Sequence, residues 1–361
     1  MPRKHTPNDG ILEALNRAQH IAFAPIVFQA VRAAFRTGFL RHLCEHPCAE
    51  QQAAEACHLS EYAASVLADM LVAAEVLSKS DDGVLSLTKT GECLLFDEMT
   101  KVNFNFTADV CYRGMDHLTE ALTQGRPAGL GELGQWETIY PAISVLPEPA
   151  RSSWFAFDHY YSDRCFGTLA VELRNRLKPR RIFDVGGNTG KFACACLQAM
   201  PETHVTLIDL PPQCAAADGN PALAPFSERF STSEVDWLEP ERLPQVNEKA
   251  DVIWMSQFLD CFSEEQAVGI LQRCRSLLTE NGRFAVLECL LERQQHPAAT
   301  FSLAAVSLYF TAMANGNSRF FRGPDLERIF ARAGLAIEER LDNLGVSHTL
   351  YILKPSGGNM P

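Results

Sequence analysis

The chain has 361 residues, of which 47% are hydrophobic and 21% are charged, and its formal net charge at pH 7 is −12. This length suits two domains, because ordinary domains hold about 100–200 residues each. A chain with this negative charge is repelled by phosphate backbones unless a local basic patch outweighs the total. The composition therefore argues against nucleic acid as a partner.

No targeting or membrane segment is expected. Residues 1–10 are polar and lack the apolar core of a signal peptide. No run of about 18 apolar residues suggests a membrane span. The twelve cysteines are scattered through helix and strand patterns, so we expect reduced thiols and a cytoplasmic location.

One cysteine cluster could bind a metal. His42, Cys44, His46 and Cys48 alternate in the segment HLCEHPC. The alternative is the end of a helix that Pro47 interrupts. Because no second ligand pair follows at zinc-finger spacing, we expect no metal here.

Helices followed by a short strand are predicted near the N-terminus. Helix-period apolar residues favour helices over 11–19, 25–43, 49–56 and 61–77, and a strand over 85–87 follows the turn at 81–83. Three helices followed by a small β-wing form the winged-helix pattern.

Winged helices often bind DNA, but the charge of this one argues against it. No Lys or Arg occurs from His42 to Ser78, and the helix that would read bases carries Glu61, Asp69 and Glu75. DNA recognition needs cations for phosphates and Arg, Asn or Gln for base edges. This region is therefore expected to pack against protein, either its own catalytic domain or the second subunit of a homodimer.

Two helices, over 104–124 and 150–177, are predicted to bridge the domains, with a Gly/Pro-rich run at 125–134 between them. From Arg181 strands alternate with helices, which favours a Rossmann-like, doubly wound parallel α/β sheet. The predicted segments are strands 182–185, 204–208, 251–255 and 283–290, helices 191–200, 264–278 and 325–333, and a final hairpin of 336–340 and 347–353. The expected domains are 1–103 (winged helix), 104–177 (bridge lining the substrate pocket) and 178–355 (catalytic).

A glycine-rich segment, IFDVGGNTGKF, carries the chemistry. Asp184 ends the first strand of the sheet, Gly186, Gly187 and Gly190 form the turn, and Lys191 begins the helix. Glycines allow the backbone to approach a ligand closely and to adopt positive φ. Ligands bind such sheets at the carboxyl ends of the strands.

The acidic residues beside this loop separate two cofactor classes. A dinucleotide would place its pyrophosphate over the loop, where the Asp184 carboxylate would repel it. S-adenosylmethionine carries a sulfonium and an ammonium group and no phosphate, so a carboxylate can help to hold it. Asp209 ends the second strand and follows Gly190 at the spacing of a carboxylate that binds ribose hydroxyls. The alternative for Asp209 is a helix cap.

The chain resembles the small-molecule O-methyltransferases of the caffeate and hydroxyindole type over nearly its whole length. The resemblance lies in the winged-helix dimerisation domain, DVGGNTGKF, TLIDLP, VDWL, ADVIWMSQFLDCFSEEQAVGILQRC and RFAVLE. It implies that Asp236 lies near the adenine amine and that Trp237 packs on the adenine ring. Leu210, and Ser256 at the position of a family Lys, complete the expected cofactor contacts.

The catalytic positions depart from the family pattern. The family has Leu-His-Asp-Trp with His as general base, whereas Asp260 stands at the His position here. Of the two acids that the family pairs with its His, one matches Glu288. The other should fall within 319–322, where Phe320 or a neighbour occurs instead. A mechanism centred on that His therefore does not transfer.

Asp260 and His159 are the candidate bases, with Glu288 as the matched acid. Methyl transfer to a phenol needs a group that takes the proton, because a phenol ionises only near pH 10. The alternative for Asp260 is a helix N-cap, a role that Ser263 fills better. His159 could instead be a helix-surface residue. Methylation of a ring carbon ortho to a phenol, and loss of activity with cofactor binding retained, also stay open.

Aromatic residues suggest a flat acceptor. The segment that caps the acceptor pocket in the family contains Phe301, Tyr309, Phe310, Met313, Phe320 and Phe321. We expect Phe310, Met313 and Phe320, together with Tyr160 from the segment WFAFDHYYSD, to contact the substrate.

The favoured function is S-adenosylmethionine-dependent methylation of a small phenolic acceptor, with O-methylation preferred. An NAD-dependent oxidoreductase is the alternative from another class, and Asp184 and the absence of a plain GxGxxG order argue against it. A non-catalytic regulator that uses the winged helix is the third, and the missing basic residues argue against that.

Overall fold

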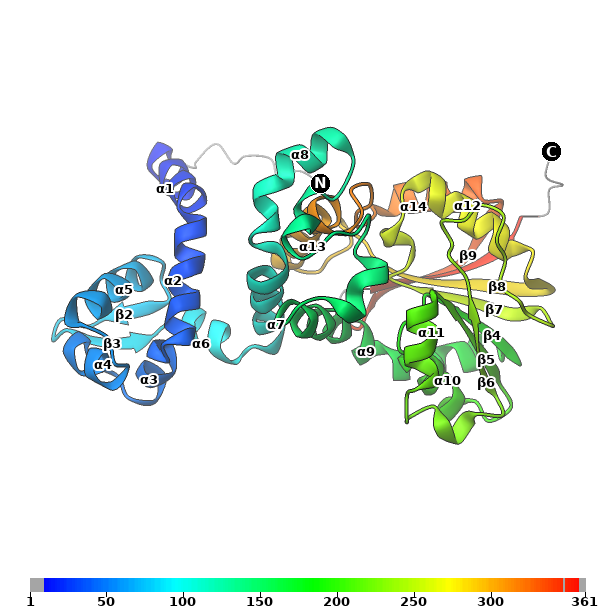
Figure 1. Ribbon diagram of the computed structural model, residues 1–361, viewed down its shortest axis with the longest axis horizontal. Helices are drawn as coiled ribbons and strands as arrows, with labels where there is room; N and C mark the ends of the chain where they lie inside the picture. Colours follow the sequence, from blue (N-terminus) through cyan, green and yellow to red (C-terminus); the bar gives the residue numbers. More distant parts are fainter. Residues whose placement is uncertain (1–9, 347, 357–361) are drawn as a thin grey trace. The chain divides into compact units, whose positions relative to one another are not determined.

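The computed structural model describes residues 10–346 and 348–356, and the chain divides into two compact units between Ala108 and Asp109 (Figure 1). The predicted third part, a separate bridge over 104–177, stays a prediction.

The first unit surrounds a small antiparallel sheet with helices. Its helices are α1 (Ile11–Ala22), α2 (Ala24–Arg36), α3 (Phe39–Glu45), α4 (Glu50–Ala56), α5 (Glu61–Ala73), α6 (Lys89–Phe96) and α7 (Glu98–Phe106). Its strands are β1 (Cys48–Ala49), β2 (Leu77–Lys79) and β3 (Val84–Leu87), in the order β1-β3-β2. Buried residues such as Leu40, Leu43, Leu71 and Leu85 form its core.

This unit differs from the sequence prediction at one break between helices, and its first helix is exposed. The helix expected over 25–43 is two helices, because Gly38 adopts φ 76° between α2 and α3. Helix α1 buries none of its residues, and Leu12 and Ile21 on it are exposed. An isolated apolar helix face of this kind needs a covering partner to be stable in water.

The second unit alternates helices and strands. Its helices are α8 (Leu118–Gln124), α9 (Ala150–Arg176), α10 (Lys191–Ala199), α11 (Pro211–Asp218), α12 (Glu264–Arg275), α13 (Pro297–Tyr309) and α14 (Gly323–Arg332). Its strands are β4 (Arg181–Val185), β5 (His204–Asp209), β6 (Phe230–Glu234), β7 (Ala250–Ser256), β8 (Leu278–Cys289), β9 (Leu335–Leu344) and β10 (His348–Pro355).

These strands form one mixed sheet in the order β6-β5-β4-β7-β8-β10-β9. Strands β4 to β8 run parallel, as predicted, and β10 lies antiparallel between β8 and β9. The strand order reverses between β4 and β7, and ligands of doubly wound sheets bind at such a reversal.

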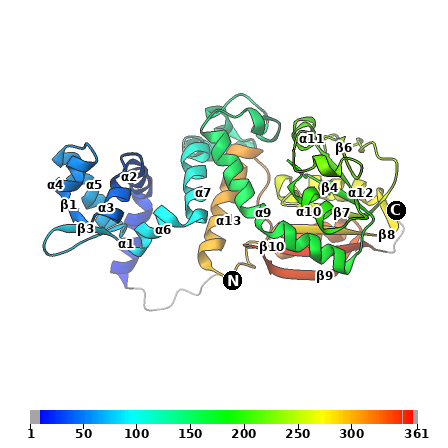
Figure 2. The same cartoon turned by 90° about the horizontal axis from the view of Figure 1, so that it is seen from below.

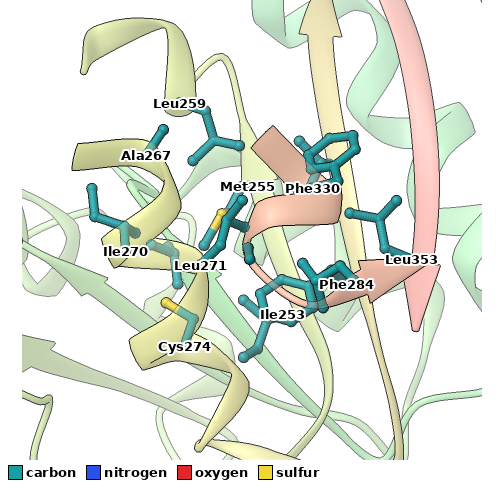
Figure 3. Packing of buried hydrophobic residues seen from close by; sticks show 14 of the residues in the cluster. Ile253, Met255, Leu259, Ala267, Ile270, Leu271, Cys274, Phe284, Phe330 and Leu353 are labelled. Carbon is teal, nitrogen blue, oxygen red and sulfur yellow. The ribbon is translucent and has the colours of Figure 1, made fainter. Parts of the chain in front are cut away.

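Alternate residues of β7 build the two layers of the core, because side chains of a strand point to opposite faces. Ile253 and Met255 pack with α12 and α14 (Figure 3). Val252 and Trp254 pack on the other face with α9 and α10. There the ring of Trp254 stacks on Phe192 with centroids 3.9 Å apart. Figure 2 shows the sheet of this unit with α9 and α10 beside it.

The helix expected over 104–124 is interrupted. A π-helical turn at Thr107–Cys111 and a 3-10 turn at Gly114–His117 separate α7 from α8. A Cβ at Gly114 would lie 1.9 Å from Sδ of Met313, so this glycine permits close contact with the turn that follows α13.

Helix α13 and the turn after it form an 18-residue helical run, Pro297–Ala314, that is apolar and long enough to cross a membrane by length and composition alone. The cores of soluble proteins contain such helices too. A third of this run is buried within the protein.

Candidate active site

The glycine-rich loop joins β4 to α10 through three left-handed residues. Gly186, Asn188 and Gly190 have φ values of 75°, 52° and 78°. A Cβ at Gly186 would lie 2.3 Å from Cδ2 of Phe258, and one at Gly187 would lie 2.7 Å from Oδ2 of Asp184. The glycines are therefore required by close contacts as well as by conformation.

Asp184 and Asp209 come together at the carboxyl end of the sheet, on the neighbouring strands β4 and β5. Burial, and then repulsion by Asp209, raise the pKa of the Asp184 carboxyl to about 7. Burial raises the pKa of Asp209 to about 6, although two backbone amides oppose the shift. Oδ2 of Asp184 is buried and has no hydrogen-bond partner among the described residues. A cation placed here would stabilise both carboxylates.

Asp209 holds the glycine loop in place and can still accept hydrogen bonds from a ligand. Its Oδ2 accepts a hydrogen bond from the backbone N–H of Asn188 at 2.9 Å, and its Oδ1 accepts one from Leu210 at 2.7 Å. Each carboxylate oxygen can accept a second hydrogen bond. The residue is therefore suited to bind a pair of hydroxyls such as those of a ribose. A glycine loop beside the unsatisfied Asp184 and a second acid, Asp209, fits a cationic nucleoside better than a pyrophosphate.

The other predicted cofactor residues lie at the end of β7 and just after β6. Ser256 ends β7, and its Oγ is buried without a partner in the described part of the chain. Asp236 accepts a hydrogen bond from the N–H of Leu238 at 2.9 Å. Trp237 is 4% exposed, and the Arg273 guanidinium lies 5.5 Å from the centroid of its ring. Their roles toward a nucleoside stay predictions.

Asp260 and Glu288, two of the predicted catalytic residues, come from neighbouring parts of the site, because Glu288 bonds the turn that carries Asp260. Asp260 lies in the 3-10 turn Leu259–Cys261 after β7 and is 2% exposed. Oε1 of Glu288, at the end of β8, accepts the N–H of Leu259 at 2.9 Å and so holds this turn. Burial raises the pKa of Asp260 to about 7, and burial and then repulsion by Asp260 raise the pKa of Glu288 well above its usual range. Asp260 thus combines a restrained position with the basicity that a general base requires.

His159 lies on α9. Its Nε2 is buried and has no hydrogen-bond partner within the described residues. Burial, and then the charge of Lys191, lower the pKa of the imidazole, so it is neutral at pH 7 and able to accept a proton.

Three of the four predicted substrate contacts cluster. Phe310 and Phe320 are buried with ring centroids 5.4 Å apart, and Met313 lies in the same π-helical turn as Phe310 (Phe310–Ala314). Tyr160 packs instead against the Arg164 guanidinium of its own helix, 4.3 Å from the ring centroid. Phe301, considered as a further contact, is 76% exposed on α13.

Sequence reasoning missed Tyr140 and Asn315. Nδ2 of Asn315 donates to the carbonyl oxygen of Cys261 at 2.6 Å and lies 3.4 Å from Oη of Tyr140. Tyr140 begins a 3-10 turn (Tyr140–Val145) and Asn315 follows the π-helical turn Phe310–Ala314, so no local pattern predicts that they converge on the turn that carries Asp260. Burial raises the pKa of Tyr140 well above its usual value.

Asp158 lies in the segment WFAFDHYYSD, in which the sequence analysis predicted only His159 and Tyr160 as site residues. Its Oδ2 accepts a hydrogen bond from Nδ2 of Asn188 at 3.2 Å, so α9 is attached to the glycine loop. Burial, and then repulsion by Asp163, raise the pKa of Asp158 to about 7. A helix-face pattern cannot indicate that this particular residue faces the loop.

Comparison with known families matches both parts of the chain. An O-methyltransferase domain matches residues 167–336 and a Dimerisation2-like domain matches residues 16–83. The first covers the glycine loop, both strand-end acids, Asp260 and Glu288.

Curated relatives include several methyltransferases and also an aclacinomycin 10-hydroxylase from Streptomyces purpurascens, which is 29% identical over 50% of this chain and 45% of its own length. A 3-amino-4-hydroxybenzoate 4-O-methyltransferase from Streptomyces cremeus is 27% identical over 61% of this chain and 58% of its own length. An L-tyrosine C(3)-methyltransferase from Streptomyces lavendulae is 22% identical over 89% of this chain and 87% of its own length. The chain therefore spans less than two thirds of the 4-O-methyltransferase and most of the C(3)-methyltransferase.

Solved structures share the fold. The mitomycin 7-O-methyltransferase superposes with a TM-score of 0.72 at 19% identity, covering 95% of this chain and 98% of that one. Human N-acetylserotonin methyltransferase, solved with S-adenosylmethionine, superposes with a TM-score of 0.65 at 18% identity, covering 97% of this chain and 99% of that one. These likenesses confirm the predicted Rossmann-like domain with a helical N-terminal domain. The two domain matches show that the chain combines an O-methyltransferase domain with a Dimerisation2-like domain.

Proposed function

We propose that this protein methylates a small phenolic acceptor with S-adenosylmethionine as the methyl donor. The observation that carries the proposal is the pair of Asp184, which is buried, and Asp209, which is half-buried, beside a glycine loop; repulsion by Asp209 helps to raise the pKa of Asp184. Bound S-adenosylmethionine would supply a methyl group already activated as a sulfonium substituent. Asp184 would face the positively charged end of the donor, and Asp209 would bind its ribose hydroxyls.

Asp260 is the proposed base. Its carboxylate takes the phenol proton as the acceptor oxygen forms its bond to the methyl carbon and the bond from that carbon to sulfur breaks. An ordinary Asp would be a poor base, but a pKa of about 7 brings Asp260 close to the working pH. His159, neutral and with Nε2 unsatisfied among described groups, is the second candidate for this role.

The aromatic cluster would hold the acceptor ring. Phe310, Met313 and Phe320 are buried together near the turn that carries Asp260, which Asn315 connects to their segment. Alignment of the acceptor oxygen with the methyl group should supply much of the rate enhancement, because positioning the reactants lowers the entropic part of the activation barrier.

Methylation at a ring carbon is the second candidate product. Two observations support this candidate. Asp260 replaces the family His, and one relative is named as an L-tyrosine C(3)-methyltransferase. The same base would draw the phenol toward phenolate, and the pose of the ring would decide whether oxygen or the ortho carbon meets the methyl group. An NAD-dependent oxidoreductase is disfavoured because Asp184 would repel a pyrophosphate.

A labelled-methyl assay tests the proposal. The purified chain is incubated with methyl-labelled S-adenosylmethionine and a panel of phenols, and NMR locates the transferred methyl on oxygen or carbon. Transfer to at least one phenol supports the function. Absence of S-adenosylhomocysteine binding by calorimetry would contradict it.

We also propose a homodimer formed through the N-terminal unit, in the cytoplasm. The exposed apolar face of α1, which includes Leu12, Leu15 and Ile21, would be covered by the second copy. Sedimentation should give a dimer for the wild type and a smaller species for Leu12→Glu combined with Leu15→Glu. A monomeric wild type would contradict the proposal.

A further inference from the structure

The chain leaves strand β7 through a residue in an unusual backbone conformation. Gln257, which follows the end of β7, has a φ of 46°, in the left-handed region that non-glycine residues rarely adopt. Its backbone N–H donates a hydrogen bond to the carbonyl oxygen of Leu287 on β8 at 2.8 Å. Such a conformation costs free energy and persists where the surrounding structure fixes it. Gln257 is therefore the point at which the chain turns from the sheet into the segment that carries Asp260.

A buried histidine holds the side chain of Gln257. Nε2 of His348, the first residue of β10, lies 2.9 Å from Oε1 of Gln257. Because the oxygen of a side-chain amide only accepts, Nε2 carries the proton and donates this hydrogen bond. His348 is 0% exposed, and burial lowers the pKa of its imidazole to about 4. The ring is therefore neutral near pH 7 and serves as a fixed hydrogen-bond donor.

The residue after Gln257 contacts the glycine loop. A Cβ at Gly186 would lie 2.3 Å from Cδ2 of Phe258, so the Phe258 ring packs directly against this loop. The same ring packs on Phe262 beyond the turn, with centroids 4.9 Å apart. The direction in which the chain leaves β7 therefore sets the position of a ring that contacts the proposed donor site.

Two strands hold the turn that carries Asp260. Strand β8 holds it through Glu288, whose Oε1 accepts a hydrogen bond from the N–H of Leu259, and β10 holds it through His348. The two strands are neighbours in the sheet, and His348 lies opposite Cys289, the residue after Glu288. The turn is thus attached to the sheet at two points along its length.

We propose that His348 is a positioning residue for methyl transfer, which fixes the left-handed Gln257 and thereby the placement of Asp260 relative to the methyl donor. The inference rests on the proposed function and goes beyond it, because it assigns a role in the reaction to a residue outside the predicted site. His348 acts through Gln257 and takes no proton from the acceptor. Its effect should be on kcat, since a displacement of about 1 Å at a reacting group can cost about a hundredfold in rate.

Stability alone does not explain this hydrogen bond. A buried polar pair loses hydration, and apolar residues of similar shape can replace both partners with little change in stability. Apolar contacts do not, however, fix the direction of a side chain as the geometry of a hydrogen bond does. A polar pair at the entrance to the turn is therefore expected where the position of the turn matters for the reaction.

Kinetics of matched variants test the inference. The full chain is assayed with methyl-labelled S-adenosylmethionine and the phenol of the panel that is methylated fastest. Rates are expressed per site that binds S-adenosylhomocysteine, so that misfolded chains are not counted. His348→Phe should lower kcat about fivefold or more and leave the affinity for S-adenosylhomocysteine within about twofold. Tyr351→Phe removes another side-chain hydrogen bond of β10, to Glu327, and should leave kcat unchanged.

Substitution of Gln257 separates a positioning role from a structural one. Gln257→Gly can adopt the left-handed conformation without strain, so this variant should fold even if His348→Phe does not. It should lower kcat about as much as His348→Phe, because the hold of β10 on the turn is lost. In the double variant, His348→Phe should change kcat by less than about twofold, since its path through Gln257 is already broken.

Three outcomes would overturn the inference without contradicting methyl transfer. They are an unchanged kcat in His348→Phe or in Gln257→Gly, an equal loss in Tyr351→Phe, and a full effect of His348→Phe in the Gln257→Gly background. If the chain methylates no phenol, the proposed function fails, and hydrogen exchange decides the inference. With S-adenosylhomocysteine bound, the amides of residues 257–261 should exchange about fivefold or more faster in His348→Phe than in the wild type, and unchanged exchange would overturn it.

Discussion

Nδ2 of Asn188 donates a hydrogen bond to Oδ2 of Asp158 at 3.2 Å, and this bond joins the glycine loop to helix α9. The backbone N–H of the same Asn188 donates to Asp209. One residue of the loop therefore contacts both the acid expected to bind the donor ribose and an acid of helix α9.

Gly186 should tolerate no side chain. Gly186→Ala would place a Cβ 2.3 Å from the Phe258 ring at φ 75°, so we expect a loss of about 1–3 kcal/mol in unfolding free energy and weaker S-adenosylhomocysteine binding. Gly269→Ala, in α12 with open space around it, is the matched control and should be neutral or stabilising. For both variants, denaturant unfolding measures the free energy of unfolding and calorimetry measures the binding of S-adenosylhomocysteine. Wild-type binding by Gly186→Ala would show that the loop does not need this glycine.

The free energy of unfolding should fall between about pH 4 and pH 7. The folded-state pKa values of Asp158, Asp184, Asp209 and Asp260 are raised to about 6 or 7, above the value near 3.9 in unfolded chains. The folded state then holds more protons in this range, so the contribution of these groups to stability is full below pH 4 and is lost as the pH rises through 7.

Asp184→Asn provides the test of that pH dependence. Denaturant unfolding at about pH 5 and about pH 8 should show a smaller loss of stability in the variant than in the wild type, because one of the responsible groups is gone. Asp218→Asn, whose carboxyl bonds Thr232 on the surface, should behave like the wild type. The same loss in Asp184→Asn as in the wild type would contradict the assignment.

Substitutions of Asp260 and His159 should identify the general base. Asp260→Asn should lower kcat by about a hundredfold or more, the scale of general-base catalysis, with little change in S-adenosylhomocysteine binding. His159→Gln keeps a polar side chain and should cost less than this. The wild-type kcat should rise with pH through about 7 as Asp260 loses its proton. If neither variant loses more than about tenfold, or about 1.4 kcal/mol of barrier, both assignments are wrong.

We expect the hydrogen bond that Glu288 accepts from Leu259 to contribute more to stability than the negative charge of Glu288 does, because this bond holds the turn in place. Glu288→Leu leaves the N–H of Leu259 without its acceptor and should cost about 1–3 kcal/mol in unfolding free energy. Glu288→Gln keeps an acceptor oxygen, and should therefore stay close to wild type. Denaturant unfolding compares the two, and equal losses would mean that the hydrogen bond does not hold the turn.

The sequence predicted the parts of the site that depend on local pattern. Asp184, Asp209 and the glycines between them were identified because a strand, a turn and a helix follow one another within a short segment. Strand β6 (Phe230–Glu234) was missed because its sequence, FSTSE, is an edge strand without apolar alternation. The break at Gly38 was missed because apolar residues continue with helical spacing on both sides of it.

Long-range convergence was beyond sequence reasoning. Tyr140, Asn315 and Cys261 lie far apart in the chain, and only the folded chain brings the amide of Asn315 to the carbonyl of Cys261. Asp158 was visible in the sequence, but the hydrogen bond that attaches it to Asn188 depends on how α9 packs on the glycine loop. Such contacts follow from tertiary packing and leave no periodic signal.

Titration of the wild-type chain with S-adenosylhomocysteine and with NADH is the most direct test of the account. We propose that the carboxylates at the ends of β4 and β5 bind a nucleoside without phosphate and repel a pyrophosphate. We expect saturable binding of S-adenosylhomocysteine, weakened about tenfold or more by Asp184→Asn combined with Asp209→Asn, and no measurable binding of NADH. Tight NADH binding without any effect of S-adenosylhomocysteine would contradict it.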